Sequence, residues 1–130
     1  LGELGSQRAY VVHGSDGLDE ITLTTSTEVA ELKTGNIKSY QIEPEQFGLS
    51  CCTANELKGG SPEENAGIIR EILEGKPGPR RDIVLLNAGA AIAVAQNISL
   101  GGGIEAAKQS LDSGAALQKL NDLVRLTNSN

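Results

Sequence analysis

The chain has 130 residues, which is enough for one domain with its own hydrophobic core. Its net charge is -6 and its longest cationic run is Arg80-Arg81, so it lacks the clustered cations that nucleic-acid binding requires. The sequence shows no signal-peptide pattern and no apolar run near the ~20 residues that cross a bilayer. Its two cysteines, Cys51 and Cys52, are neighbours, and we expect them to be reduced. We therefore expect a cytoplasmic protein without a membrane partner.

Three strands are predicted in the first third of the chain. Arg8 to His13 is a short aliphatic run, which is typical of a buried strand. Thr27 to Lys33 and Ile37 to Ile42 are predicted as the second and third strands, with Gly35-Asn36 as the hairpin turn because both residues tolerate positive φ. Pro44 ends the third strand, and we expect this antiparallel pair to lie at the edge of a sheet.

The second half of the chain predicts helices. Ser61-Pro62-Glu63-Glu64 is a capping box with proline at the first helical position, and Gly75 is placed to end the helix that it starts. Asp82 to Gln96 is apolar on nearly every side and too long for a strand, so we expect a fully buried helix. Gly101-Gly102-Gly103 is expected to break the chain, and Gly114 to separate two further helices. The apolar stripes of the other helices are Ile68, Ile69, Ile72 and Leu73, then Ile104, Ala107 and Leu111, then Leu117, Leu120 and Leu123.

This order of elements predicts an α/β fold in which a strand and an antiparallel hairpin are followed by about four helices. A lone three-stranded sheet that carries a buried helix is an unusual independent domain. We therefore expect residues 1–130 to be the C-terminal part of a larger α/β domain whose first strands lie upstream. The chain begins at Leu1 and contains no methionine, which also favours a piece of a longer protein.

The end of the first strand carries the strongest chemical signal. Gly14 closes the apolar run, and the carboxylates of Asp16, Asp19 and Glu20 follow it closely. In α/β proteins ligands bind just beyond the carboxyl ends of strands, and neighbouring carboxylates suit a hard cation that also binds a substrate phosphate. Adjacent residues of a regular strand point to opposite faces, so joint chelation by Asp19 and Glu20 requires a bent loop, which Gly17 permits.

Other polar and glycine residues have structural explanations that we weigh above functional ones. Asp16 is expected to hold the turn, with metal ligation as the alternative. His13, the only histidine, is expected to be a hydrogen-bonded core residue without a catalytic role, and Asn87 to anchor a neighbouring loop. Gly59-Gly60 is read as a tight turn rather than an anion site. Arg80-Arg81 is read as a solvated pair without a function.

The run Val11-Val12-His13-Gly14, followed by Asp16-Gly17-Leu18-Asp19-Glu20, resembles the anthranilate phosphoribosyltransferase family of tryptophan biosynthesis. The resemblance covers essentially the whole chain and corresponds to the C-terminal part of that enzyme. Its one departure is the glycine triplet, where a single glycine is expected. The further landmarks, in the order of the family, are Pro44-Glu45 with Phe47-Gly48-Leu49, Leu57 with Gly59-Gly60, Glu64-Asn65-Ala66, Leu86-Asn87-Ala88-Gly89-Ala90-Ala91 and Asp112-Ser113-Gly114.

The resemblance implies an enzyme in which the amine of anthranilate attacks the anomeric carbon of phosphoribosyl pyrophosphate and pyrophosphate leaves. It implies that Asp19 and Glu20 bind Mg²⁺, which stabilises the charge that gathers on the leaving group. No nucleophilic residue is required, because positioning and charge neutralisation carry such a reaction.

Motifs of the family that do not occur in this sequence matter equally. The glycine-rich Gly-Thr-Gly-Gly-Asp loop, the Lys-His-Gly-Asn segment and the arginine of the anthranilate site belong upstream in the family. We therefore expect the 130-residue chain alone to be inactive. The active form is expected to be a homodimer that includes the N-terminal helical domain and the phosphate-loop segment.

Two alternatives remain open at this point. A pyrimidine-nucleoside phosphorylase shares the scaffold, but it does not need magnesium, so the acidic pair argues against it. A non-catalytic paralogue that binds nucleic acid is opposed by the net charge of -6.

Overall fold

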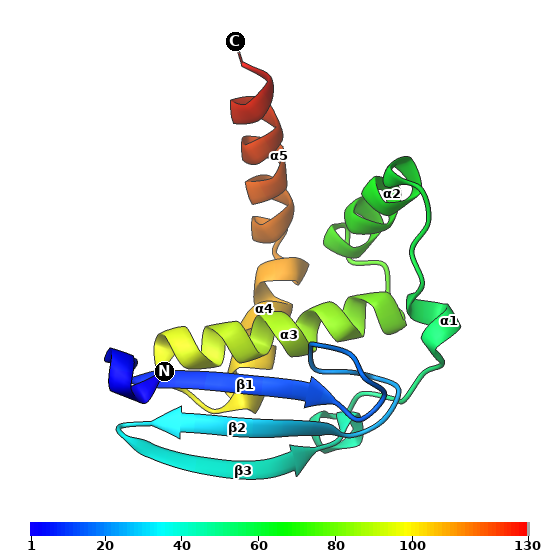
Figure 1. Cartoon of the computed structure of the whole chain (residues 1–130). Coiled ribbons are helices and arrows are strands. Elements are labelled where there is room, and N and C mark those ends of the chain that lie inside the picture. The colour runs from blue at the N-terminus through cyan, green and yellow to red at the C-terminus, as the bar shows by residue number, and fades with distance from the viewer. Residues whose placement is uncertain (130) are drawn as a thin grey trace.

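Three antiparallel strands and the helices that follow them form the fold, which the computed structural model describes for residues 1–129. Helix α3 lies along one face of the sheet, and α5 points away from it toward the C-terminus (Figure 1). The α/β prediction of a strand, a hairpin and four long helices is confirmed, with one short helix, α1, added. The elements are β1 (Arg8–Gly14), β2 (Thr27–Lys33), β3 (Asn36–Ile42), α1 (Ala54–Leu57), α2 (Pro62–Leu73), α3 (Pro79–Gln96), α4 (Leu100–Asp112) and α5 (Ala115–Asn128), with 3₁₀ turns at Gly2–Leu4 and Pro44–Phe47.

The sheet has the order β1-β2-β3, and its register puts Thr27 opposite Ile42, both of them buried. Lys33 pairs with Asn36, so the hairpin turn is Thr34-Gly35, with φ values of 47° and 80°. The prediction of a Gly35-Asn36 turn is therefore wrong by one residue. A shift of one residue would turn the core-facing side chains of a strand to solvent, so burial decides the register and Thr34 takes the positive φ.

The core lies between the sheet and α3. Leu86 of α3 is 1 % exposed, and it belongs to the same apolar cluster as Val29 of β2 and Leu23 of the loop before that strand. The prediction that α3 is fully buried is wrong, because Val84 is 38 % exposed and Ala91 is also exposed. Within residues 1–129, α3 is covered where it meets the sheet, α1 and α4, and Val84 and Ala91 are not covered.

The glycine triplet lies inside α4 and does not break the chain, contrary to our expectation. Ser99 caps this helix, and its hydroxyl accepts a hydrogen bond of 3.1 Å from the backbone N–H of Gly102. A Cβ at Gly103 would collide with the carbonyl oxygen of Gly89, and a Cβ at Gly89 would lie 2.7 Å from the backbone of Ile104. Glycine at these two positions lets the backbones of α3 and α4 touch, which outweighs the poor helix propensity of glycine.

The expected start signal of α2 is confirmed. The hydroxyl of Ser61 accepts the N–H of Glu64 at 3.2 Å, and the Glu64 carboxylate accepts the N–H of Ser61 at 2.6 Å. The apolar stripes of α2 and α5 nevertheless contain no buried residue, and Ile69 and Leu123 are 48 % and 57 % exposed. Packing within residues 1–129 therefore covers these stripes only in part, as where Ile72 and Leu73 lie against the core cluster.

Strand β1 is less buried than its aliphatic sequence predicts, so the prediction of a buried strand is also corrected. Val11 is 57 % exposed and His13 is exposed, because one face of β1 meets neither α3 nor α4.

Among residues 1–129 no single helix has the length and apolar composition to cross a bilayer. Only α3 and α4 taken together meet both conditions, and the pair is bent by 113°.

Candidate magnesium-binding loop

The loop between β1 and β2, residues 15–26, carries the acidic pair and lies at the same end of the molecule as α1 and the start of α3 (Figure 1). Its first turn is tight: the N–H of Gly17 donates to the carbonyl of Gly14 at 2.8 Å, and the N–H of Gly14 donates to the carbonyl of Leu18 at 2.9 Å. Gly17 has a φ of 96°, which favours glycine. The chain therefore bends at Gly17, two residues before the acidic pair.

Asp16 holds this turn, as expected. Its carboxylate accepts hydrogen bonds from the N–H of Leu18 at 3.1 Å, from the hydroxyl of Thr22 at 2.6 Å, and from the hydroxyl of Thr24. Burial of the carboxylate acts to raise its pKa, but the bonds from Thr22 and Thr24 outweigh it and hold the pKa of Asp16 below its usual value. Asp16, the first acid of the motif, is thus occupied within the loop.

Gly14 permits this arrangement by close packing at the end of β1. A Cβ at this position would lie 2.5 Å from a carboxylate oxygen of Asp16 and 3.1 Å from the side chain of Thr22. Any larger residue would displace the carboxylate from its partners.

Asp19 and Glu20 both have exposed side chains, and neither forms an ion pair or a side-chain hydrogen bond with residues 1–129. Partial burial, followed by the negative charge of Asp19, raises the pKa of Glu20. Two repelling carboxylates without a cationic partner are a donor set that a hard divalent cation stabilises.

The number of available donors also fits magnesium. The described part of the chain contains no cluster of three or more histidine, cysteine, aspartate or glutamate residues able to hold a metal ion. Mg²⁺ is usually held by about one or two protein carboxylates and fills its other positions with water and substrate phosphate oxygens. A pair of acids in an open loop suits this coordination of Mg²⁺ better than it suits a structural metal site in which protein groups supply every ligand.

A groove of about 490 Å³ lies beside Glu20. Its lining also includes Asn55 of α1 and Lys58, the residue after that helix. Its remaining lining residues are Asp16, Leu18, Thr24, Ala54, Leu57 and Ile83.

The loop is attached to the buried helix through Asn87. The side-chain oxygen of Asn87 accepts the N–H of Ile21 at 2.9 Å, and its amide nitrogen donates to the carbonyl of Ile21 at 2.8 Å. The prediction that Asn87 anchors a neighbouring loop is confirmed, and the loop is the one that carries Asp19 and Glu20.

The prediction that Arg80-Arg81 is a solvated pair is wrong. Arg81 is 13 % exposed and donates a hydrogen bond of 2.6 Å to the carboxylate of Asp112 at the end of α4. Arg80 donates to the carbonyl of Lys58 at 2.7 Å. Both arginines therefore connect the first turn of α3 to other elements, and this required tertiary contacts that no local pattern reveals.

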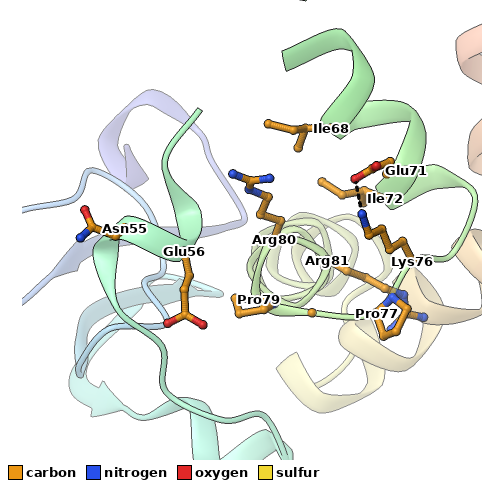
Figure 2. A pocket seen from close by; sticks show the side chains of 11 residues that line it. Asn55, Glu56, Ile68, Glu71, Ile72, Lys76, Pro77, Pro79, Arg80 and Arg81 are labelled. Carbon is orange, nitrogen blue, oxygen red and sulfur yellow. Dashed lines mark hydrogen bonds and ion pairs between the residues drawn. The ribbon is translucent and has the colours of Figure 1, made fainter. Parts of the chain in front are cut away.

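A second pocket, of about 300 Å³, lies between α1, α2 and the first turn of α3. Figure 2 shows the side chain of Arg80 pointing into the space between α1 and α2, and the ion pair of Glu71 with Lys76 at its border. Glu71 pairs with Lys76 and Arg81 with Asp112, whereas Arg80 bonds to the carbonyl of Lys58 and forms no ion pair with the described residues.

Three further features were considered for a functional role in the sequence: His13, the Gly59-Gly60 pair and the two cysteines. His13 is exposed, so the prediction of a core histidine is wrong. The N–H and carbonyl of Gly60 both bond to the Asn65 side chain, at 2.9 Å and 3.1 Å, which attaches this segment to the helix that follows it. Both cysteines are free, as expected, and the Cys51 thiol donates to the Glu45 carboxylate at 3.0 Å.

Comparison with known proteins identifies the family. Residues 1–117 match the sequence model described as "Glycosyl transferase family, a/b domain". The chain belongs to this family. Among curated members, the chain is 49% identical over 130 residues to the anthranilate phosphoribosyltransferase of Desulfatibacillum aliphaticivorans, and 50% identical over 129 residues to that of Trichlorobacter lovleyi. The matches cover 98% of this chain but 38% and 37% of those two relatives.

Solved members of the family share the fold. The structure of anthranilate phosphoribosyltransferase from Thermus thermophilus matches with a TM-score of 0.83 and 39% identity, covering 94% of this chain and 36% of that one. The enzyme from Saccharomyces cerevisiae in complex with PRPP and Mg matches with a TM-score of 0.78 and 30% identity, covering 88% of this chain and 33% of that one. The resemblance to anthranilate phosphoribosyltransferases is thereby confirmed, over little more than a third of the relatives' length.

Proposed function

We propose that this chain is the C-terminal part of the α/β domain of a magnesium-dependent anthranilate phosphoribosyltransferase. The reaction is the transfer of the phosphoribosyl group from phosphoribosyl pyrophosphate to the amine of anthranilate, in tryptophan biosynthesis. The observation that carries the proposal is the pair of exposed, unpaired acids, Asp19 and Glu20, in a bent loop beyond β1. The complex of the yeast relative with PRPP and Mg supports it.

In this proposal Asp19 and Glu20 hold Mg²⁺ through their carboxylate oxygens. When bound, the ion supplies neutralisation of the negative charge that accumulates on the departing pyrophosphate. The raised pKa of Glu20 follows from burial and from the neighbouring Asp19 charge, and both effects favour binding of a cation over leaving the carboxylate bare.

The remaining work of this chain is to keep the loop in place. Asp16 closes its first turn, and Asn87 holds its backbone at Ile21. No residue of the chain is assigned the role of nucleophile, because the anthranilate amine is the nucleophile. Catalysis then rests on orientation of the two substrates and on charge neutralisation.

The activity is proposed for the full-length protein. This chain spans 38% of the length of the Desulfatibacillum relative, and the sequence Gly-Thr-Gly-Gly-Asp does not occur in it. The phosphate-loop segment and a helical domain are proposed to come from the N-terminal part, and the full-length enzyme to be a cytoplasmic homodimer. The 130-residue chain by itself is expected to be inactive, and turnover by the purified chain would contradict this.

The test is the double substitution Asp19→Asn with Glu20→Gln in the full-length enzyme, with Glu105→Gln on α4 as the control. Glu105 is an exposed acid without a hydrogen bond or ion pair in the described chain. We expect the double variant to lose turnover by about 100-fold or more at limiting Mg²⁺, because a charge-stabilising group is removed. Its free energy of unfolding is expected to change by less than about 0.5 kcal/mol.

The result that overturns the metal role is unchanged turnover of the double variant at limiting Mg²⁺. Two other assays decide the reaction class. Phosphate-dependent cleavage of a pyrimidine nucleoside by the full-length protein, without phosphoribosyl transfer, would replace the proposal with a phosphorylase. Salt-sensitive retention on DNA without either activity would replace it with a nucleic-acid-binding role.

A further inference from the structure

Asn87 connects the buried helix α3 to the residue that directly follows the acidic pair. Its side-chain amide meets both polar groups of the Ile21 backbone, at 2.9 Å to the N–H and 2.8 Å to the carbonyl. Its nitrogen also donates to the carbonyl of Ile83, one turn back in the helix, at 3.1 Å. The two residues lie 66 positions apart, so this contact exists only in the folded protein.

The residue type is demanding at this position. Asn87 follows Leu86, which is 1 % exposed, on a helix that is otherwise apolar over this stretch. Burying a polar group in part costs free energy unless the group is hydrogen-bonded. Bonding to both the N–H and the carbonyl of Ile21 requires an acceptor and a donor on the same short side chain. Aspartate lacks the donor, leucine lacks both, and glutamine is longer by one methylene group.

The acidic pair is held at both ends. Before Asp19, the N–H of Leu18 donates to Asp16 and its carbonyl accepts from Gly14. After Glu20, the Ile21 backbone is fixed by Asn87, and the Ile21 side chain is buried with 2 % exposure. Only the two acids between these points lack a partner in the described chain.

We propose that Asn87 is a positioning residue for the magnesium site, because it fixes the backbone at Ile21 and so sets where the Glu20 carboxylate lies. The inference rests on the proposed function, and it adds a residue on α3 to the determinants of metal binding. Partners that orient metal ligands typically change metal affinity about 10- to 100-fold when they are removed. A shift of that size in the Mg²⁺ requirement is the expected signature.

The test uses the full-length enzyme with Asn87→Leu, which removes all three side-chain hydrogen bonds, and Asn87→Asp, which keeps the acceptor and loses the donor. The control is Leu32→Ala, a truncation of a 6 % exposed core residue near the hairpin end of β2, away from the acidic loop. Three quantities are measured: the Mg²⁺ concentration for half-maximal turnover, the binding of Mn²⁺ alone by electron paramagnetic resonance, and the hydrogen-exchange rate of the Ile21 amide.

We expect Asn87→Leu to raise the Mg²⁺ requirement about 10- to 100-fold, with turnover recovering at saturating Mg²⁺ and the KM for anthranilate unchanged. Mn²⁺ binding should weaken in parallel, and the Ile21 amide should exchange faster. Asn87→Asp should show a smaller shift, and it keeps the test open if the leucine variant does not fold. The control should lose stability without a change in its Mg²⁺ requirement.

An unchanged Mg²⁺ requirement in a folded Asn87 variant overturns the inference. So does a loss of turnover that saturating Mg²⁺ does not restore, since that is a structural effect alone. The Asp19→Asn/Glu20→Gln variant distinguishes failure of the proposed metal site from failure of the positioning role of Asn87. If this variant leaves the Mg²⁺ requirement unchanged, the proposed metal site fails. If it changes the requirement and the Asn87 variants do not, only the positioning role fails.

Discussion

Thr22 donates a hydrogen bond of 2.6 Å to the carboxylate of Asp16, so the first acid of the motif is engaged inside the loop that presents the other two. Thr22 is 1 % exposed, which makes its hydroxyl a fixed donor rather than a mobile one. The three acids of one short motif therefore divide into a structural acid and a pair that is open to a ligand.

Asp16→Asn is expected to lower the free energy of unfolding by about 1 kcal/mol at pH 7, because a charged acceptor of several hydrogen bonds becomes a neutral one. The pKa of Asp16 is depressed in the fold, since the bonds from Thr22 and Thr24 outweigh burial. Its stabilisation is therefore present above the ordinary carboxyl value of about 4 and is lost as the pH falls through the folded pKa.

Urea unfolding of the full-length wild type and the Asp16→Asn variant at pH 7 and pH 3 checks this. The difference in unfolding free energy should be smaller at pH 3 than at pH 7, because the stabilisation declines once the pH falls below the ordinary carboxyl pKa. An equal difference at both pH values would show that the charge of Asp16 does not stabilise the loop.

Substitutions in the glycine triplet should have opposite effects within one turn of α4. A Cβ at Gly103 collides with the carbonyl of Gly89, so Gly103→Ala is expected to destabilise the protein by about 1–3 kcal/mol. Gly101 is exposed with nothing within 4 Å of a built Cβ, so Gly101→Ala should stabilise it by up to about 1 kcal/mol. Thermal unfolding of both variants measures the pair of effects, and a loss of stability in Gly101→Ala would contradict the helical assignment of the triplet.

Arg8 joins the sheet to the end of α3. Its guanidinium donates to the carbonyls of Ala93 at 2.6 Å and Ile98 at 2.8 Å, and forms an ion pair with Glu31 at 3.3 Å. Arg8→Leu leaves the Glu31 carboxylate, which is 18 % exposed, without its counter-charge, so we expect a loss of about 3–5 kcal/mol.

The double variant Arg8→Leu with Glu31→Leu provides the matched comparison, because it removes the stranded charge as well. Chemical unfolding should show that this second substitution restores part of the lost stability. If Glu31→Leu only adds to the loss, the ion pair is not the reason that Arg8 matters.

The Cys51 thiol should react slowly with alkylating reagents although it is exposed. The hydrogen bond that it donates to the Glu45 carboxylate is the main reason that its pKa is raised to about 11. Glu45→Gln should lower this pKa and increase the rate of iodoacetamide labelling at pH 8.5 by at least about tenfold, because the thiolate is the reactive form. Mass spectrometry of the labelled peptide measures the rate, and the half-buried Cys52 on the same peptide serves as the internal reference. Equal rates in wild type and variant would show that Glu45 does not control the thiol.

Much of the site was predictable because its signals are local. Glycine before and within the motif indicates a bend, and adjacent acids in a bend suit a cation, so the sequence and its family resemblance nominate Asp19 and Glu20, whose role as metal ligands stays a prediction. Asn87 was also identified, because an amide within an apolar helix needs a partner. Its actual partner, Ile21, could not be named, since 66 residues separate the two in sequence.

Other assignments failed where a residue's environment comes from a distant segment. His13 and Val11 lie in an aliphatic run, but the face of β1 that they occupy has no covering element within residues 1–129. Arg80-Arg81 has the composition of a solvated pair, yet the end of α4 supplies Asp112 to one of the two. Neighbouring residues determine neither which element covers a strand nor which acid pairs with an arginine, because both depend on segments that are distant in sequence.

The amino-acid sequence by itself determined the strands, the start of α2, and the acidic loop, because hydrophobic periodicity, capping residues and positive-φ glycine act over a few residues. Only the tertiary structure decided that α3 and α4 come into backbone contact at Gly89 and Gly103. It also decided that Arg8 donates to the carbonyls at the end of α3, and that Asn87 bonds to the loop of the acidic pair. These contacts depend on which surfaces meet when the sheet and α3 bury their common core, and that is a property of the whole packed chain.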